Sequence, residues 1–339
     1  MLNKLTLFVL AILTSGILYA QITPPTLGPG EFWTNNWSLS YDYQTNGSVR
    51  YIIQDPANAN NLCAILMATH DSSSAAGTNR YIWFSYSSDA GNSWEATASI
   101  TTTFFSGFPC LTVDNAGQPT AAFHMSATPT SAQVWKDLTF GVGSWAQIGT
   151  IPNTPDLVVW PHIGATTNGN MLVAGCNNPP ADNGVTVLYN GTSWSAQNPL
   201  AGTSGPSGNY SVEAGPGGRV YIFGTDNFVL DVTKLWTSTD NGVTLTLQSG
   251  ANAPPNFIID STPDTMLAFI DGGKSGIYVG NDVHLVYSVY ANSSETVPNP
   301  PNTLWYKKTK IVHWSAATGL DTVAGRFNMP NMADPITHA

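Results

Sequence analysis

The chain has 339 residues, of which 9% are charged, and its 21 acidic residues outnumber 11 basic ones, giving a net charge of −10. This surplus of acids disfavours binding to nucleic acid or to an anionic membrane, because both carry negative charge. The 31 Gly and 23 Pro residues are typical of short strands and many turns rather than of charged helices. The composition therefore indicates an acidic, secreted β-protein.

Residues 1–20 have the pattern of a secretory signal peptide, in which Lys4 precedes an apolar run that ends at Leu18. The run is too short to span a bilayer. An anchor that is never cleaved is the alternative, because Leu18 is large for its place in the cleavage pattern. We expect a secreted or cell-surface protein with no membrane attachment after cleavage, and residues 21–46 follow as an N-terminal segment.

An octapeptide at residues 87–94, SSDAGNSW, recurs along the chain. Residues 238–245, STDNGVTL, repeat it with Leu in place of Trp, and Trp145 and Trp194 end weaker copies. The last residues of the four copies are 51, 49 and 51 residues apart, an interval typical of propellers and solenoids. Ser and Asp side chains bond nearby backbone N–H groups in such a turn, and Gly supplies a positive φ. The octapeptide predicts a structural hairpin clamp rather than a catalytic site.

A second turn cluster recurs in phase with the octapeptide, and an apolar, β-rich run follows it each time. Each unit therefore reads as two hairpins, which are the four strands of a propeller blade. The starting points of the units are near Val49, Pro109, Trp160, Tyr210 and Phe257. The sequence predicts an all-β propeller of four-stranded antiparallel blades over residues 47–339, as a single domain.

Five blades are visible, and the number in the intact protein stays open at this point. Residues 326–330 resemble the beginning of a further blade, but only nine residues follow Pro330. We expect six blades with the last incomplete here, and a five-bladed ring is the alternative. The N-terminal segment within 21–46 is expected to supply a strand that closes the ring.

Together these features resemble the Asp-box (BNR repeat) β-propellers of the sialidase superfamily. The resemblance implies that the octapeptide turns lie on the face opposite the ligand site. It gives a structural role to Ser87, Asp89, Gly91, Trp94, Ser238, Asp240 and Gly242. The fold alone does not decide the function, because propellers host many.

In a four-stranded blade, the start of the inner strand and the end of the second strand reach the same rim of the central funnel. The candidate binding residues at these places are Arg50, His70, Asp71, His124, Trp160, His162, Tyr210 and Asp271. Asp71, Asp226 and Asp271 are the candidate catalytic carboxylates. This mixture of side chains suits a concave sugar-binding pocket. The alternatives are strand ends that simply turn to solvent, and Trp160 and Tyr210 as packing between blades.

The sialidase catalytic set is matched at one position. Arg50 fits the Arg that binds the substrate carboxylate in that family, and Asp71 is the only substitute for its catalytic Asp. Tyr210 stands where the family has a Glu, and Glu213 is three residues away, which moves its side chain along the strand and to its other face. A sialidase needs three converging Arg residues, and the four in this chain do not supply them.

Three function classes follow. The first is a non-catalytic secreted propeller that binds a glycan or an extracellular protein at its funnel rim. The second is a divergent glycoside hydrolase or lyase, exo-sialidase-like or carboxylate-based, which for hydrolysis needs two carboxyls at a suitable separation. The third is a structural or assembly propeller that grips a protein partner. No cofactor or metal site is expected, and the three cysteines are predicted to be buried small hydrophobic residues.

Overall fold

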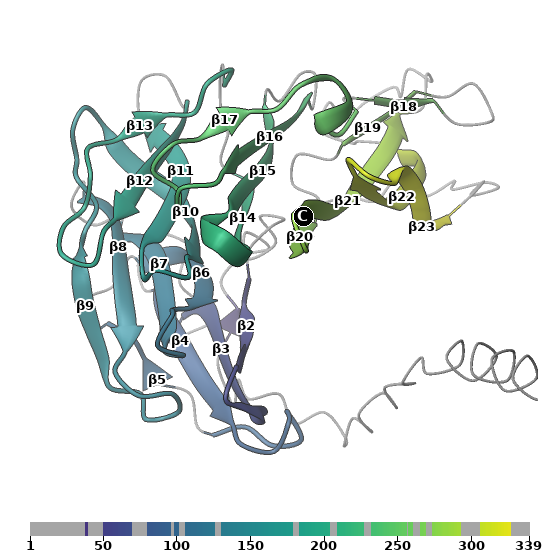
Figure 1. Ribbon diagram of the computed structural model, residues 1–339. Coiled ribbons are helices and arrows are strands. Elements are labelled where there is room, and N and C mark those ends of the chain that lie inside the picture. Colours follow the sequence, from purple (N-terminus) through teal and green to yellow (C-terminus); the bar gives the residue numbers. More distant parts are fainter. Residues whose placement is uncertain are drawn as a thin grey trace, which may run out of the picture. The chain divides into compact units, whose positions relative to one another are not determined.

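The computed structural model describes residues 38–39, 50–69, 80–95, 98–101, 106–125, 130–178, 183–203, 209–226, 232–255, 257–259, 265–268, 273–292 and 306–326. All of them belong to the unit Trp33–Ala339. They form five antiparallel sheets arranged as a five-bladed β-propeller (Figure 1). The predicted all-β propeller is confirmed. Residues 326–330, apart from the backbone of Arg326, lie outside the described residues.

The first sheet contains the N-terminal strands. Its members are β1 (Ser38–Leu39), β2 (Ile52–Asp55), β3 (Asn58–Thr69), β4 (Arg80–Ser87) and β5 (Ala98–Ser99). Both β1 and β2 pair with β3, β1 with its last residues and β2 with its first half. Within the N-terminal segment, the described pair Ser38–Leu39 therefore belongs to the first blade.

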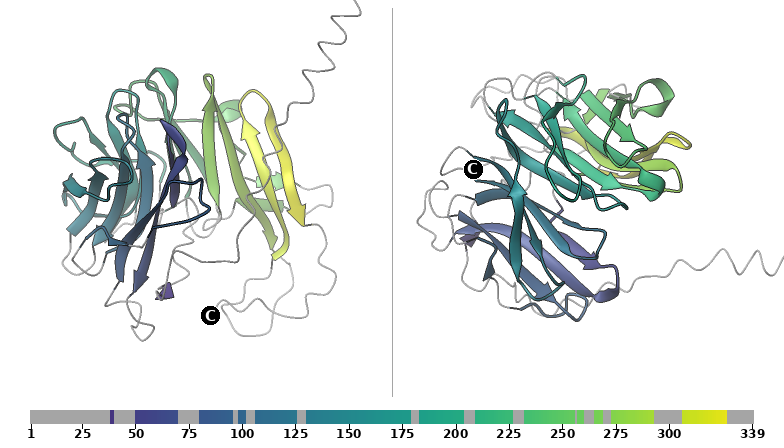
Figure 2. Two further views of the ribbon diagram at one scale, coloured as in Figure 1. Left: turned by 90° about the horizontal axis from the view of Figure 1, so that it is seen from below. Right: turned by 60° about the vertical axis from the view of Figure 1, so that its left-hand side comes forward.

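The three middle sheets have four strands each, in chain order from the inner to the outer edge. The second sheet is β6 (Ser106–Val113), β7 (Pro119–Met125), β8 (Thr130–Asp137) and β9 (Trp145–Thr150). The third is β10 (Leu157–Ala165), β11 (Met171–Asn178), β12 (Gly184–Tyr189) and β13 (Asn198–Pro199). The fourth is β14 (Tyr210–Ala214), β15 (Val220–Asp226), β16 (Val232–Ser238) and β17 (Thr246–Leu247). Figure 2 shows these sheets from two further sides.

The fifth sheet differs from the four-stranded unit that the sequence predicts. It has six strands: β18 (Phe257–Ile259), β19 (Thr265–Ala268), β20 (Lys274–Val279), β21 (Asp282–Asn292), β22 (Tyr306–Ser315) and β23 (Gly319–Arg326). β19 pairs with the end of β21 and β20 pairs with its beginning. The long strand β21 therefore accommodates two hairpins, and its length gave no periodic signal in the sequence.

Four apolar clusters hold neighbouring sheets together, one between each consecutive pair. Cys63, Ile65 and Met67 of the first sheet meet Leu111 and Phe123 of the second. Equivalent clusters join the second to the third, the third to the fourth and the fourth to the fifth sheet. Strand β7, PTAAFHM, is buried at every residue because both of its faces are covered.

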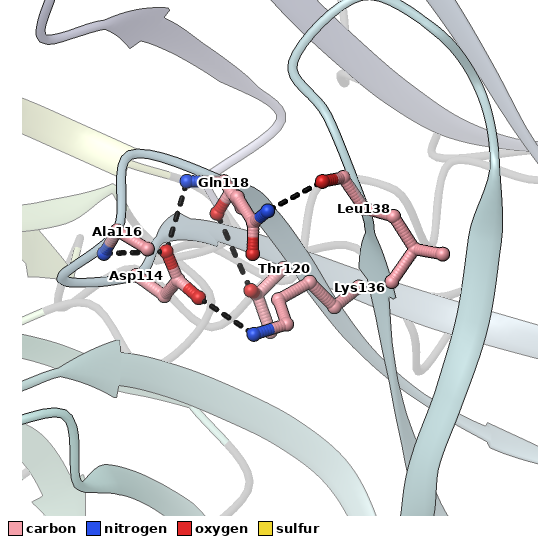
Figure 3. Close-up of polar contacts among 6 residues, drawn as sticks. All are labelled: Asp114, Ala116, Gln118, Thr120, Lys136 and Leu138. Atoms are coloured by element: carbon pink, nitrogen blue, oxygen red, sulfur yellow. Dashed lines mark hydrogen bonds and ion pairs between the residues drawn. The ribbon is translucent and has the colours of Figure 1, made fainter.

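Turn side chains fix the hairpins. In the turn after β6, Asp114 Oδ1 accepts hydrogen bonds from the backbone N–H groups of Ala116 and Gln118, both at 2.9 Å (Figure 3). Asp114 Oδ2 forms an ion pair with Lys136 Nζ of β8 at 3.0 Å. The Gln118 side-chain amide donates to the carbonyl of Leu138. The turn is thus tied to the third strand of its sheet as well as to its own hairpin.

The three cysteines, Cys63, Cys110 and Cys176, are buried and form no disulfide. The prediction that they act as small hydrophobic residues is confirmed. Burial raises the pKa of Cys63 and of Cys110. Both thiols are therefore protonated at neutral pH and unreactive.

Two neighbours on β21 test the one-sided burial of the fifth sheet. Leu285 is fully buried against the fourth sheet, whereas Val286 on the opposite face is 38% exposed. We expect Leu285→Ala to lower the free energy of unfolding by about 2–5 kcal/mol and Val286→Ala by less than about 1 kcal/mol. Urea unfolding measures both. Equal losses would contradict the packing of this sheet.

Candidate functional site

A cavity of about 430 Å³ lies between the inner edges of the first four sheets and strands β20, β21 and β22 of the fifth sheet. Its lining residues are Arg50, Cys110, His162, Tyr210, Ser211, Val212, Gly273, Lys274, Ser275, Val286, Tyr287, Ser288 and Ile311. All five sheets contribute, since Arg50 precedes β2 and the others come from β6, β10, β14 and the fifth sheet. Three of the sequence-predicted binding residues, Arg50, His162 and Tyr210, are thereby brought to one concave surface.

Arg50 connects three sheets. Its carbonyl accepts a 2.9 Å hydrogen bond from the N–H of Leu111, which fixes its backbone against β6. Its guanidinium donates to Thr112 Oγ1 at 3.3 Å and to the carbonyl of Val212 at 3.5 Å. The same group forms an ion pair with the carboxylate of Glu213. The side chains of Arg50 and Glu213 are 32% and 29% exposed, so the pair is partly withdrawn from solvent.

Glu213 is not a candidate site residue in the sequence analysis. In the structure it forms an ion pair with Arg50. Glu213 is the fourth residue of β14, three residues from Tyr210. The shift does change its face within its own sheet, but the long Arg50 side chain reaches β14 from the first sheet. Burial raises the pKa of Glu213, and the Arg50 guanidinium opposes that rise. The signal that could have identified this pair is the low content of charged residues in the chain, 9%. A partly buried Arg or Glu near an inner strand needs a partner of opposite charge.

Tyr210 and His162 form one wall of the cavity and are also packing residues. Tyr210 is fully buried, and its ring meets His162 edge-on at 6.1 Å and Trp236 at 6.2 Å. A Cβ added at Gly184 would lie 2.1 Å from Tyr210 Oη, so glycine is required there. Tyr210 therefore packs between the third and fourth sheets, as the alternative interpretation predicts, and it also lines the cavity.

His124 and Trp160 form a separate cluster with Phe108, outside the cavity lining. The ring of His124 stacks on Phe108 at 4.9 Å, and its Nδ1 accepts a 3.1 Å hydrogen bond from the N–H of Trp160. Phe108 and Trp160 both occupy bulges, in β6 and β10, with φ of 55° and 50°. Sequence reasoning missed Phe108, although Phe108-Pro109 and Trp160-Pro161 are the same dipeptide pattern in consecutive blades.

The remaining candidates have no described side chain. His70, Asp71 and Asp271 lie outside the described residues, and Asp226 is the last residue of β15. Their proximity to the cavity stays a prediction. Within the described ranges, no group of three His, Cys, Asp or Glu side chains has the arrangement of a metal site, and no helix has the length and apolarity needed to cross a membrane.

The two octapeptide turns make the same three hydrogen bonds. After β4, Ser87 Oγ donates to Asp89 Oδ1 and accepts from the N–H of Gly91, and Asp89 Oδ1 accepts from the N–H of Ser93, all at 2.8 Å. The turn after β16 has the equivalent bonds among Ser238, Asp240, Gly242 and Thr244, at 2.7, 2.9 and 2.8 Å. Most of the polar capacity of each turn is therefore used inside the turn.

These bonds act on the acids of the turns. The hydrogen bonds from the Ser93 hydroxyl and N–H, and from Ser87, lower the pKa of Asp89 to about 2. Burial acts to raise the pKa of Asp240, but the bonds from Ser238 and Thr244 outweigh it and the pKa is lowered. Both side chains are charged at neutral pH, as a clamp of N–H donors requires.

No protein-family model and no curated protein matches the chain. Among solved structures it is similar to the NanB sialidase from Streptococcus pneumoniae, with a TM-score of 0.51 and 10% identity over 87% of this chain and 64% of that one. It is also similar to a protein of unknown function from Dyadobacter fermentans (TM-score 0.47, 14% identity, 79% and 96% covered). The Aleuria aurantia lectin gives a TM-score of 0.45 at 10% identity, with 88% and 100% covered. The likeness to the sialidase shows the fold alone, and the chain spans less than two thirds of that protein.

The lowered pKa of Asp89 predicts that the stability of the fold decreases at acid pH. The Asp89→Asn variant is expected to remove part of this decrease. The folded-state pKa of Asp89, about 2, is below its ordinary value of 3.8, so its contribution to stability is present above the ordinary value and is lost as the pH falls towards 2. The Asn variant is expected to lose less stability than the native chain between about pH 4 and about pH 2. Thermal unfolding across this range tests it, and a carboxyl NMR titration midpoint of Asp89 near 4 would contradict it.

Proposed function

We propose that the protein is a secreted β-propeller that binds a glycan in its central cavity and does not hydrolyse sialosides. The carrying observation is the cavity of about 430 Å³, to which Arg50, His162 and Tyr210 contribute from three different sheets. Its volume falls in the range of small-molecule sites, and its wall combines the exposed apolar side chains of Val286 and Ile311 with the hydroxyl groups of Ser275 and Ser288. Apolar side chains suit the apolar face of a sugar, and hydroxyl groups suit its hydroxyls.

We further infer that the octapeptide turns are Asp boxes. The support is their shared hydrogen-bond pattern and their shared position between the third and fourth strands of a sheet. We also infer that residues 1–20 are an export signal, because Lys4 precedes an apolar run that is too short to span a bilayer.

The arginine arrangement argues against sialoside hydrolysis. Arg50 forms an ion pair with Glu213, and Arg219 donates a hydrogen bond to the carbonyl of Pro216 in a turn. Arg80 and Arg326 belong to β4 and β23, the third strand and the outermost strand of their sheets. Strands lie about 4.8 Å apart, so β4 begins roughly 10 Å outside the inner edge. Three guanidinium groups converging on one carboxylate are not provided by this arrangement.

Turnover of a sialoside is therefore expected to be absent. The secreted chain is incubated with 4-methylumbelliferyl N-acetylneuraminide and compared with a heat-inactivated sample. We expect no difference, because loss of each charge partner at such a site lowers the rate by about a hundredfold or more. Turnover that disappears in Arg50→Lys would overturn the non-catalytic assignment.

Glycan binding is tested by filling the cavity. Ser275 is an exposed residue of the cavity wall on β20, and Thr246 is an exposed residue of β17 outside the cavity. A glycan array on the secreted chain provides the ligand, and calorimetry measures its affinity for both variants. Ser275→Trp is expected to weaken binding by at least about tenfold, which corresponds to about 1.4 kcal/mol, because the ring occupies the ligand's place. Thr246→Trp is the matched control and is expected to bind normally.

An array with no hit would count against the proposed function. Equal binding by the two Trp variants would instead move the site away from the central cavity, towards the outer surfaces of the blades.

A further inference from the structure

Resting on the proposed glycan site, we propose that the central cavity selects neutral, hydroxyl-bearing sugars over acidic ones, because the charge of Arg50 is already neutralised by Glu213. Arg50 then ties the first sheet to the second and the fourth, and its guanidinium charge is balanced by Glu213 rather than by a ligand carboxylate. Glu213 becomes the residue that determines specificity.

The first step is the occupancy of the guanidinium. Arg50 forms an ion pair with Glu213 and donates to Thr112 Oγ1 and to the carbonyl of Val212. These acceptors come from two different sheets, so the guanidinium is held in place by the fold. An acidic ligand would have to share or displace the carboxylate of Glu213, and a displaced carboxylate would stay partly buried without its partner.

The second step concerns the other charges around the cavity. Lys274 is the other cationic residue of the cavity wall within the described residues, and it is 4% exposed and has an interaction partner of its own. The chain as a whole carries a net charge of −10. Its field repels anions and lowers their concentration near the site. No feature of the described wall therefore offers an uncommitted positive charge to a carboxylate.

The third step is what the wall offers to a neutral ligand. Ser275 and Ser288 carry hydroxyl groups that both donate and accept, as sugar hydroxyls do. The side chains of Val286 and Ile311, which are 38% and 43% exposed, add apolar surface for the ring of a sugar.

Matched sugar pairs test the selectivity. The probes are the methyl glycosides of glucose and galactose and their C6-carboxylate counterparts, the methyl glycosides of glucuronic and galacturonic acid. Affinities are measured by calorimetry on the secreted full chain. We expect the neutral member of a pair to bind at least about tenfold tighter, because only the acid must compete with Glu213.

Two variants locate the cause of that preference. Glu213→Gln removes the neutralising carboxylate while keeping an acceptor for Arg50, and Ser275→Lys adds a free cation at an exposed position of the wall without touching the pair. Both are expected to shift the ratio of acid to neutral affinity by about tenfold towards the acid. Ser275→Lys keeps the test valid if Glu213→Gln folds poorly.

The outcomes separate the two proposals. An acid that binds the native chain as tightly as its neutral counterpart, or a ratio that neither variant shifts, overturns the neutral selectivity and leaves the glycan site intact. A chain that binds neither these probes nor any glycan of the array overturns the proposed function itself.

Discussion

The structure depends on the burial of sheet faces against neighbouring sheets. The second strand of a middle sheet presents alternate residues to the preceding and the following sheet, so both of its faces must be apolar. On β15, Val220 and Ile222 face the third sheet, and Tyr221 and Phe223 face the fifth. This explains why the second strands read as continuous apolar runs with no alternation. The central cavity lies at the inner edges of the first four sheets, where this face-to-face packing between neighbouring sheets ends.

The fifth sheet shows what happens when no further sheet within the described residues covers one of its faces. Its residues towards the fourth sheet are buried, and those on the other face are not: Ile277, Val279, Val286 and Ile311 are 59%, 53%, 38% and 43% exposed. Val286 and Ile311 also line the central cavity. The cavity therefore has one wall that belongs to an exposed sheet face, on which Ser288 of β21 pairs with Ile311 of β22. A wall of this kind can contact the apolar face of a sugar ring while the opposite walls supply the polar groups.

The sequence allowed the repeat to be predicted because its signals are local. Turn residues such as Asp89 and Asp240 hydrogen-bond within five residues of themselves, and that chemistry is readable from spacing alone. The blade starts near Trp160 and Tyr210 are likewise within the strands that line the centre. The features that the sequence did not predict depend on residues that lie far apart in the chain. The six strands of the fifth sheet depend on the length of β21, and the partner of Arg50 lies 163 residues away on another sheet.

The missed pair follows from a rule about charge rather than about strands. In a chain with 9% charged residues, an ionisable side chain next to an inner strand is seldom alone, because a partly buried charge without a partner is costly. Matching Arg50 to a ligand carboxylate treated it as open to solvent, whereas the fold supplies the carboxylate from within. The same reasoning links stability to the specificity proposed above. The bond that ties the first sheet to the fourth is also the bond that removes a positive charge from the cavity, so the two properties cannot be changed independently at this position.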